Sequence, residues 1–435
     1  MNMHIGTVQL LNYLKHRDLT VSFNSQFNVI VGRNGSGKTS LLRALTDAMV
    51  GFTNFANYSP WQAWIGKEGV ANEECVSHGA SIRFEARFPV KVSTAAYLDT
   101  MRLDWSVQKN SAVDHSKVEG VTPFARLQQV GNINSDEFKS TTLPLILFYQ
   151  ADRNWPAVPT NMMQAATQKV SRDHAYANWL TASSDNATLQ TWVVSKSLER
   201  LQAAQDGAVS TDAIQGDELS VVVQAICAAL PECQDVRYDM AKKSIIVKWD
   251  VDGVVQRVPY EQLSDGQRTI MGLIADIARR MVVLNPHLGI KVCAETPGIV
   301  LIDELDIHLH PKWQRQIANG LKAAFPNIQF ITASHSPQIL GELKPDEIIM
   351  LGADGALHPQ VSYGLDSSSV LEEIMGAGAR TEPIDKQVAQ LFLVLEQGYL
   401  DLARNLLGQL KSTAPGLPEL AGAEALLKRK EVLGR

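Results

Sequence analysis

A glycine-rich octapeptide at residues 32–39 has the residue types and spacing needed to bind phosphate. It reads Gly-Arg-Asn-Gly-Ser-Gly-Lys-Thr, follows an apolar run at 27–31 and opens a helix-like stretch at 38–50. Glycines let consecutive backbone N–H groups wrap a phosphate at the N-terminus of a helix. Because glycine makes up about 7% of residues in an average protein, the odds that this pattern occurs by chance in the chain are on the order of one in a hundred. The flanking strand and helix therefore favour the phosphate-binding interpretation.

This octapeptide matches the Walker A pattern of P-loops, which predicts ATP and Mg²⁺ as ligands. Lys38 is expected to reach the β- and γ-phosphates, and Thr39 to offer its hydroxyl to Mg²⁺. The residues predicted to contact the nucleotide are Arg33, Asn34, Gly35, Ser36, Gly37, Lys38, Thr39 and Ser40.

Two acidic residues follow a second apolar run, at 299–302. Asp303 would hold Mg²⁺ through its water shell, and Glu304 would orient or deprotonate the attacking water. Acidic residues often end buried strands, so this motif by itself indicates little. Paired with the octapeptide, it predicts the Walker B element of an ATP-hydrolysing site.

The segment Leu-Ser-Asp-Gly-Gln-Arg, residues 263–268, stands at the start of the most regular helical pattern, 267–284. Ser264 and the backbone of Gly266 could present donors and a helix dipole to an anion. A serine N-cap followed by a glycine turn would explain the same residues. The segment lies between the Walker A and Walker B motifs, and this order resembles the ABC-type ATPase head with its LSGGQ-like signature.

That resemblance assigns roles to two further residues. His335 ends the apolar run 328–332 and resembles the switch histidine that contacts the γ-phosphate. Gln150 closes the run 145–149 and resembles the Q-loop glutamine that reads Mg²⁺ and the attacking water, although a single glutamine after a strand is common. Residues 15–17, Lys-His-Arg, lie beside adenine or ribose, or else form a solvated basic turn; the residues favour neither interpretation.

The residues that follow the Walker B motif indicate which group of ABC-type ATPases the chain resembles. Residues 305–315 resemble the corresponding element of RecF/OLD-like ABC ATPases. His308 and His310 lack a convincing third and fourth ligand, so a zinc site is rejected. Four further segments are similar to the ATPase subunit of Septu-type anti-phage systems (PtuA) and to retron-associated ATPases: residues 325–340, 149–153, 369–376 and 428–431.

Two residues depart from the ABC pattern. Asp265 replaces the first of the paired signature glycines, and its carboxylate should repel a γ-phosphate unless it turns away to cap the helix. Leu305 stands where many ABC proteins have proline. Both departures argue against a transporter subunit more than against nucleotide binding.

The expected fold class is α/β. It is an ABC-ATPase head, a P-loop NTPase with a mainly parallel core sheet, an antiparallel β lobe and a helical insertion, followed by a C-terminal helical segment. The predicted organisation has four parts: an N-terminal ATPase half with Walker A and a β-rich insertion, a helical insertion, a C-terminal ATPase half with signature, Walker B and switch histidine, and a helical docking segment. Their bounds are 1–150, 151–230, 231–378 and 379–435.

Composition limits the class of protein. The chain has 435 residues, 45% hydrophobic and 20% charged, with a net charge of −6, which excludes disordered, collagenous and disulfide-scaffold proteins. No run of 18 uncharged apolar residues occurs, so no membrane span is expected. Four cysteines at spacings unlike zinc motifs predict a reducing compartment, the cytoplasm.

The resemblance implies a regulatory or sensing ATPase of phage defence that controls a separate HNH-type nuclease. One P-loop and one signature per chain predict a homodimer or higher homo-oligomer, with DNA reached through the assembled complex. A RecF-like DNA-repair clamp remains the alternative, whereas long-coil proteins are excluded because residues 40–263 show no sustained heptads.

The tail, residues 381–435, carries scattered acidic residues that do not form a nuclease centre, so no nuclease activity of its own is expected. Pro415 and Pro418 are expected to separate two amphipathic helical pieces. One apolar stripe in the tail is predicted as intramolecular core, or less strongly as a docking face: Leu391, Leu395, Tyr399, Leu402, Leu406 and Leu410.

Overall fold

The computed structural model divides the chain into two units, Met1–Leu365 and Asp366–Arg435. The second unit begins at Asp366, before the boundary expected at 379. The structure describes residues 2–49, 65, 67, 69–78, 81–120, 139–153, 155, 170–184, 186–205, 216–251, 253–352, 355–377 and 381–433.

A six-stranded core sheet, counted over the described residues, has the strand order β16-β15-β3-β14-β13-β9. Its strands pair in parallel except for β16, which is antiparallel to β15. The strands are β3 (Phe27–Val31), β9 (Leu145–Tyr149), β13 (Gly298–Ile302), β14 (Ile328–Ala333), β15 (Ile348–Gly352) and β16 (Gly355–Leu357). Every residue of β3, β9, β13 and β14 is buried, as continuous apolar runs predict for a parallel sheet.

The parallel pairing brings the carboxyl ends of β3, β9, β13 and β14 to one edge of the sheet. The segments that follow these strands are the octapeptide, Gln150, the Asp303–Glu304 pair and His335. Strand β14 lies between β3 and β13, so residues far apart in the chain become neighbours at that edge. The predicted motifs therefore share one location.

An antiparallel sheet forms the β lobe, with order β2-β1-β6-β7-β8 among the described residues. Its strands are β1 (Met3–Tyr13), β2 (His16–Ser22), β6 (Val90–Leu98), β7 (Met101–Lys109) and β8 (Lys117–Gly120), beside a hairpin of β4 (Glu73–His78) and β5 (Ser81–Ala86). In the sequence, the first strong strand signal is the apolar run at residues 27–31. Strand β1 was not predicted from the sequence, because polar residues interrupt its apolar positions and a bulge shifts its register on β6.

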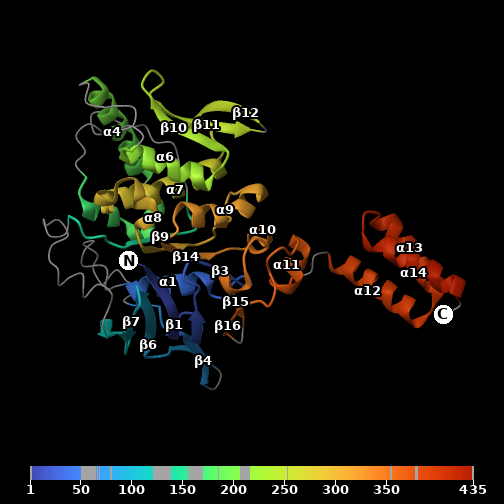
Figure 1. The fold of residues 1–435 in the computed structure, drawn as a ribbon. Helices are drawn as coiled ribbons and strands as arrows, with labels where there is room; N and C mark the ends of the chain where they lie inside the picture. The colour runs from blue at the N-terminus through green and yellow to red at the C-terminus, as the bar shows by residue number, and fades with distance from the viewer. Residues whose placement is uncertain are drawn as a thin grey trace. The chain divides into compact units, whose positions relative to one another are not determined.

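Helix α1 (Lys38–Ala48) packs between the two sheets, against β1, β6 and β14. Its C-terminal turn is fixed by the β lobe, where Trp105 Nε1 donates to Ala48 O at 2.7 Å and Tyr13 Oη donates to Asp47 Oδ2 at 2.7 Å. Figure 1 shows α1 and the β lobe on one side of the core sheet, with α6, α7 and α9 on the other. The helix that begins at the octapeptide is therefore held from both sides.

The other face of the core sheet carries the helical part and a three-stranded antiparallel sheet, as far as the described residues extend. The strands are β10 (Cys233–Asp239), β11 (Ser244–Val251) and β12 (Val254–Pro259). The sequence pattern of residues 235–258, with a turn at 251–254, predicts two or three strands here. The helices are α4 (Asn186–Gln205), α6 (Glu218–Ala229), α7 (Asp265–Leu284), α8 (Val292–Glu295), α9 (Pro311–Ala324) and α10 (Pro337–Leu340). Short 3-10 helices join them: η5 (Arg172–Tyr176), η6 (Trp179–Ser184), η7 (Tyr260–Gln262), η8 (Pro286–Lys291) and η9 (Pro345–Glu347).

Buried anchors such as Trp179 and Trp192 predict a helix from about 162 to 204, and small and polar residues predict a loop at 205–217. Among the described residues the helix is regular only from Asn186 onward, because two short 3-10 helices precede α4. Residues 162–169 and most of 205–217 lie outside the described residues. These observations and the two sheets confirm the α/β fold class, with its mainly parallel core, antiparallel lobe, helical insertion and C-terminal helices.

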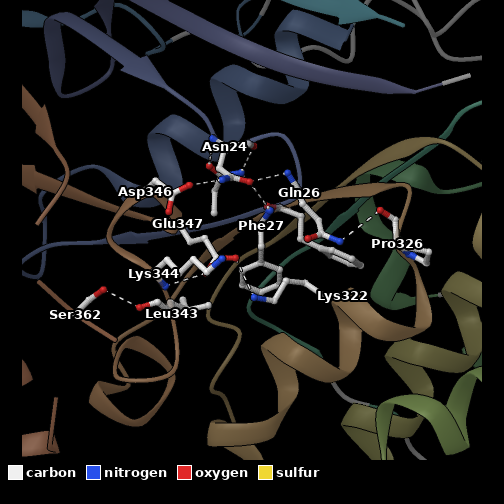
Figure 2. A network of polar contacts seen from close by, with 12 residues as sticks. Asn24, Gln26, Phe27, Lys322, Pro326, Leu343, Lys344, Asp346, Glu347 and Ser362 are labelled. Carbon is white, nitrogen blue, oxygen red and sulfur yellow. Dashed lines mark hydrogen bonds and ion pairs between the residues drawn. The ribbon is translucent and has the colours of Figure 1, made fainter. Parts of the chain in front are cut away.

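The amino end of β3 is anchored away from the octapeptide by a polar network (Figure 2). Asn24 Nδ2 donates to Asp346 Oδ2 at 2.6 Å, and Lys322 forms an ion pair with Glu347 at 2.9 Å. The Lys322 ammonium also lies 5.6 Å from the ring centroid of Phe27, the first residue of β3. These contacts join β3 to α9 and η9 and fix the strand from which the phosphate loop leaves.

The second unit contains four helices among its described residues: α11 (Ser367–Glu373), α12 (Glu382–Gln397), α13 (Leu400–Thr413) and α14 (Glu419–Leu433). The tail was expected as two pieces, and this was wrong because Gly398 ends α12 in the left-handed conformation, at φ 81°. The apolar stripe is broken there. Leu391, Leu395 and Leu410 enter the core of the unit, as predicted, whereas Tyr399 is 62% exposed. Over the described residues, no helix is long and apolar enough to cross a bilayer.

Candidate nucleotide site

The octapeptide turns tightly between β3 and α1. Gly35 and Gly37 have φ values of 81° and 96°, in the left-handed region that favours glycine. A Cβ on Gly37 would also lie 2.6 Å from Cε1 of the His16 ring, so this position has no room for a side chain. The loop therefore keeps its backbone exposed where α1 begins.

The Lys38 ammonium folds back onto the loop. Its Nζ donates to Gly32 O at 3.0 Å and to Arg33 O at 3.4 Å, and the residue is 8% exposed. Burial lowers the pKa of Lys38, and nearby carboxylates, Asp303 first, oppose that shift. The Ser36 hydroxyl is buried and has no hydrogen-bond partner among the described residues. This donor set fits a phosphate group.

The Walker A and Walker B residues meet directly. Thr39 Oγ1 donates to Asp303 Oδ2 at 2.9 Å, although the two residues are 264 positions apart. Asp303 is 6% exposed. A hydroxyl and a carboxylate oxygen at one point are the oxygen ligands that Mg²⁺ prefers, so the pair fits the predicted metal.

Past Asp303, the chain turns sharply. Glu304 is exposed and has φ 50°, and the main-chain N–H of Leu305 donates to Ala333 O at 2.8 Å. Arg153 donates to the carbonyl oxygens of both Asp303 and Glu304 at 2.6 Å. The sequence had assigned no role to Arg153.

His335 follows β14 and is half-buried. Asp306 holds this turn, because its Oδ1 accepts from the His335 main-chain N–H at 3.1 Å and from Ser334 Oγ at 2.7 Å. Sequence reasoning missed Asp306. Its place just after the paired acidic residues was the available signal, but only the fold brings it to β14.

Gln150 lies at the same sheet edge, directly after β9. Its Nε2 donates to Leu180 O at 3.0 Å, toward the 3-10 helix η6. The structure brings Thr39 and Asp303 into contact and orients the Gln150 amide toward the helical part. The Q-loop role of Gln150 stays a prediction.

The signature segment forms the start of α7. Ser264 is its N-cap, with Gln267 N donating to Ser264 Oγ at 3.3 Å and Ser264 N donating to Gln267 Oε1 at 2.9 Å. Asp265 forms an ion pair with Arg268 and does not cap the helix. That its carboxylate turns away from a γ-phosphate stays a prediction. A Cβ on Gly266 would overlap His308 O of the same chain, so this glycine is needed for packing within the subunit.

Two groups predicted near the nucleotide contact the loop itself. Lys15 Nζ donates to Gly35 O at 2.9 Å, and His16 Nε2 lies 3.1 Å from Gly37 O. Burial lowers the pKa of His16, against the opposing effect of its bond to Gly37. The solvated-turn interpretation fits exposed Arg17 but not buried His16. Contact with adenine or ribose stays a prediction.

A buried ionic cluster joins β9 to α7. Asp276, 0% exposed, accepts from Arg279 at 2.6 Å, from Arg280 at 2.8 Å and from Tyr149 Oη at 2.8 Å. Arg280 also donates to Ala175 O at 2.8 Å. Burial raises the pKa of Asp276, but the two guanidinium groups outweigh it, so the net shift is downward. The signature helix is thereby tied to the strand that ends at Gln150.

Comparison with known proteins agrees with this geometry. Residues 121–341 match a family described as "AAA domain, putative AbiEii toxin, Type IV TA system", and residues 7–215 match a second AAA-domain family. The retron Ec83 probable ATPase of Escherichia coli is 26% identical over 433 residues, covering 88% of this chain and 78% of the relative.

Two further likenesses are more limited. The Septu protein PtuA of Bacillus thuringiensis is 35% identical over 138 residues, covering 29% of this chain and 34% of that protein. A solved Smc head domain bound to the C-terminal domain of ScpA, from Pyrococcus furiosus, covers 86% of this chain and 99% of that one, with 13% identity and a TM-score of 0.45.

Proposed function

Because this chain belongs to the AAA-domain ATPases and is homologous to retron ATPases and Septu PtuA, we propose that it binds and hydrolyses Mg·ATP to regulate a defence nuclease. The observation that carries the ATPase proposal is the Thr39–Asp303 contact at 2.9 Å, beside the Lys38 ammonium. Lys38 and Thr39 come from the phosphate loop and Asp303 from the end of β13, so two distant segments supply the three groups that such a site needs.

The residues divide the chemistry among them. Lys38 and the main-chain N–H groups of the loop hold the phosphates, while Thr39 and Asp303 would hold Mg²⁺. When bound, that ion supplies positive charge to the phosphate oxygens. Glu304 orients the attacking water and accepts its proton, and His335 contacts the γ-phosphate.

Two variants test the ATPase proposal. Lys38→Ala should abolish ATP binding, because the loop loses its cation. Glu304→Gln should retain ATP but block turnover, because it removes a group that acts chiefly on water. Lys291→Ala is a matched control, because the Lys291 side chain is 70% exposed at the end of the 3-10 helix η8, outside the motifs. Unchanged hydrolysis in both site variants would overturn the assignment.

A homo-oligomer completes the proposal. One chain supplies one phosphate loop and one signature, and we assign Ser264 and Gly266 to a neighbouring chain's nucleotide. Arg33, Asn34, Gly35, Ser36, Gly37 and Ser40 contact the nucleotide of their own chain, and Gln150 reads its metal. A sedimentation experiment with Glu304→Gln should give dimers or larger species in ATP and smaller ones without it.

The regulated partner is proposed to be a separate HNH-type nuclease, with DNA engaged through the assembled complex. Purified chain with ATP and Mg²⁺ or Mn²⁺ should leave plasmid intact until such a nuclease is added. Reproducible cleavage by the lone chain would contradict this. ATP-dependent binding of DNA by the lone chain, without cleavage, would instead favour a RecF-like clamp.

A further inference from the structure

Arg153 is an almost fully buried cation without an assigned role. It lies shortly after β9 and is 2% exposed. Its Nη1 donates to Asp303 O and its Nη2 to Glu304 O, both at 2.6 Å. Burial lowers its pKa to about 10, against the opposing carboxylates of the Walker B turn, so the guanidinium stays charged at neutral pH. The charged Arg153 guanidinium thus binds two consecutive main-chain carbonyl oxygens.

The main chain that Arg153 binds has an unfavourable conformation at Glu304. Asp303 continues the hydrogen bonding between β13 and β9, because its main-chain N–H donates to Tyr149 O at 2.8 Å. Glu304, the next residue, has φ 50°, a left-handed conformation that disfavours any residue with a Cβ. Such a backbone persists only where its surroundings hold it. Besides Arg153, the Glu304 carbonyl accepts from Ile307 N at 3.0 Å.

The two carboxylates of the Walker B turn differ in how they are held. Asp303 is fixed through its side chain by Thr39. The Glu304 side chain is exposed, and within the described ranges no hydrogen bond restrains its carboxylate. Its direction therefore follows from the main-chain conformation at Glu304, which Arg153 contacts.

We propose that Arg153 is a positioning residue for ATP hydrolysis: its paired bonds hold the Asp303–Glu304 main chain and so aim the Glu304 carboxylate at the attacking water. The inference rests on the proposed ATPase function. The planar guanidinium offers two parallel donors that span adjacent carbonyls, whereas a lysine ammonium is a single point charge. Arg153 acts through Glu304 and needs no contact with nucleotide.

The test uses the full chain with Arg153→Met and Arg153→Lys. Arg153→Met should lower kcat about 100-fold, at the lower end of the range that a positioned general base contributes, and Arg153→Lys should fall between it and the wild type. The Kd for Mg·ATP and the KM should stay within about threefold, because the phosphate loop is untouched. Arg172→Met is the matched control. Arg172 also donates to main-chain carbonyls, Leu284 O and Thr141 O, but away from Walker B.

A double variant separates positioning from general support of the fold. If Arg153 acts through Glu304, then Arg153→Met combined with Glu304→Gln should be no slower than Glu304→Gln alone. Losses that multiply, or a wild-type kcat in Arg153→Met, would overturn the inference. Should Arg153→Met fail to fold, as its unfolding midpoint would reveal, Arg153→Lys replaces it in the same cycle. Inactive Lys38→Ala and Glu304→Gln beside fully active Arg153 variants would refute the positioning role alone. Full activity of both Lys38→Ala and Glu304→Gln would refute the proposed function as well.

Discussion

The phosphate-loop edge of the core sheet and the start of α7 are built in opposite ways. At the sheet edge, the Thr39–Asp303 and Arg153–Asp303 bonds join residues 264 and 150 positions apart. At the start of α7, Ser264 and Asp265 are exposed and bond within the next turn. The first region is preorganised by tertiary contacts, whereas the second is a locally complete helix cap, which suits the proposed role of completing another chain's site.

The largest effect is expected where α7 is tied to the sheet. Asp276→Asn should destabilise the chain by about 3–5 kcal/mol, because two buried guanidinium groups lose their anion. Differential scanning calorimetry at pH 7 measures this. The folded pKa of Asp276 lies below its usual value, so its contribution is present above about pH 4 and is lost as pH falls through the lowered pKa. The difference between variant and wild type should shrink below pH 4, and a constant difference would contradict the assignment.

At the sheet edge, Asp303→Asn should slow hydrolysis by about a hundredfold or more, since metal stabilisation of the transferred phosphoryl group is worth several kcal/mol. Steady-state turnover across a Mg²⁺ titration checks it, with nucleotide binding measured in parallel. Asp346→Asn is the control, because this carboxylate accepts from Asn24 at the amino end of β3, the end opposite the phosphate loop. Equal turnover in Asp303→Asn and wild type would remove the metal role.

At the start of α7, Ser264→Asp and Ser264→Asn form a matched pair. Asparagine and aspartate both serve as N-caps, so neither variant should change the free energy of unfolding by more than about 0.5 kcal/mol. If Ser264 faces a partner's γ-phosphate, the added charge in Ser264→Asp should slow hydrolysis about tenfold, or about 1.4 kcal/mol. Ser264→Asn should slow it less.

Mixing tests whether that effect occurs in trans. Combining Ser264→Asp with Lys38→Ala should restore one intact composite site per mixed dimer. Ser264 substitutions are preferable to Gly266→Asp, because any side chain at Gly266 would overlap His308 O in its own subunit. A mixture that hydrolyses ATP no faster than the average of the two homodimers, although both variants fold and dimerise, would refute the trans arrangement.

The smallest effect is expected at Asp265. Its ion pair with Arg268 is on the surface, with the Asp265 side chain 74% exposed. Asp265→Asn should therefore change stability by about 0–1 kcal/mol. Hydrolysis should be unchanged or slightly faster, because a negative charge is removed. A loss of turnover as large as that of Ser264→Asp would mean that the Asp265 carboxylate itself has a role.

Local motifs were predictable because their chemistry lies in consecutive residues. The phosphate loop, the paired acidic residues and the Ser264 cap each show their function in a few adjacent positions. Arg153 gave no such signal, because its partners are main-chain carbonyls of another segment. Asp306 follows the paired acidic residues, but its position did not reveal that it binds Ser334 and His335. A buried arginine that binds carbonyls looks, in sequence, like any solvated arginine.

The helices and strands also divide into those that local sequence predicted and those that it did not. Continuous apolar strands such as β13 and β14 were predicted within a residue, since burial on both faces leaves an unbroken apolar run. Strand β1 was missed because its outer positions are polar. The tail was divided at its prolines, whereas Gly398 adds an earlier break through its positive φ.

The sequence alone determined the kinds of groups in this protein: a glycine-rich loop before a helix, a pair of acidic residues after a strand, a helix cap and a mainly parallel core. Only the tertiary structure decided which groups meet. Strand order places β14 between β3 and β13, and hydrogen bonds across 150 to 264 residues then orient Asp303 and Glu304. Spacing along the chain encodes local conformation, but the partner of a buried donor depends on which strands lie side by side, which no single segment specifies.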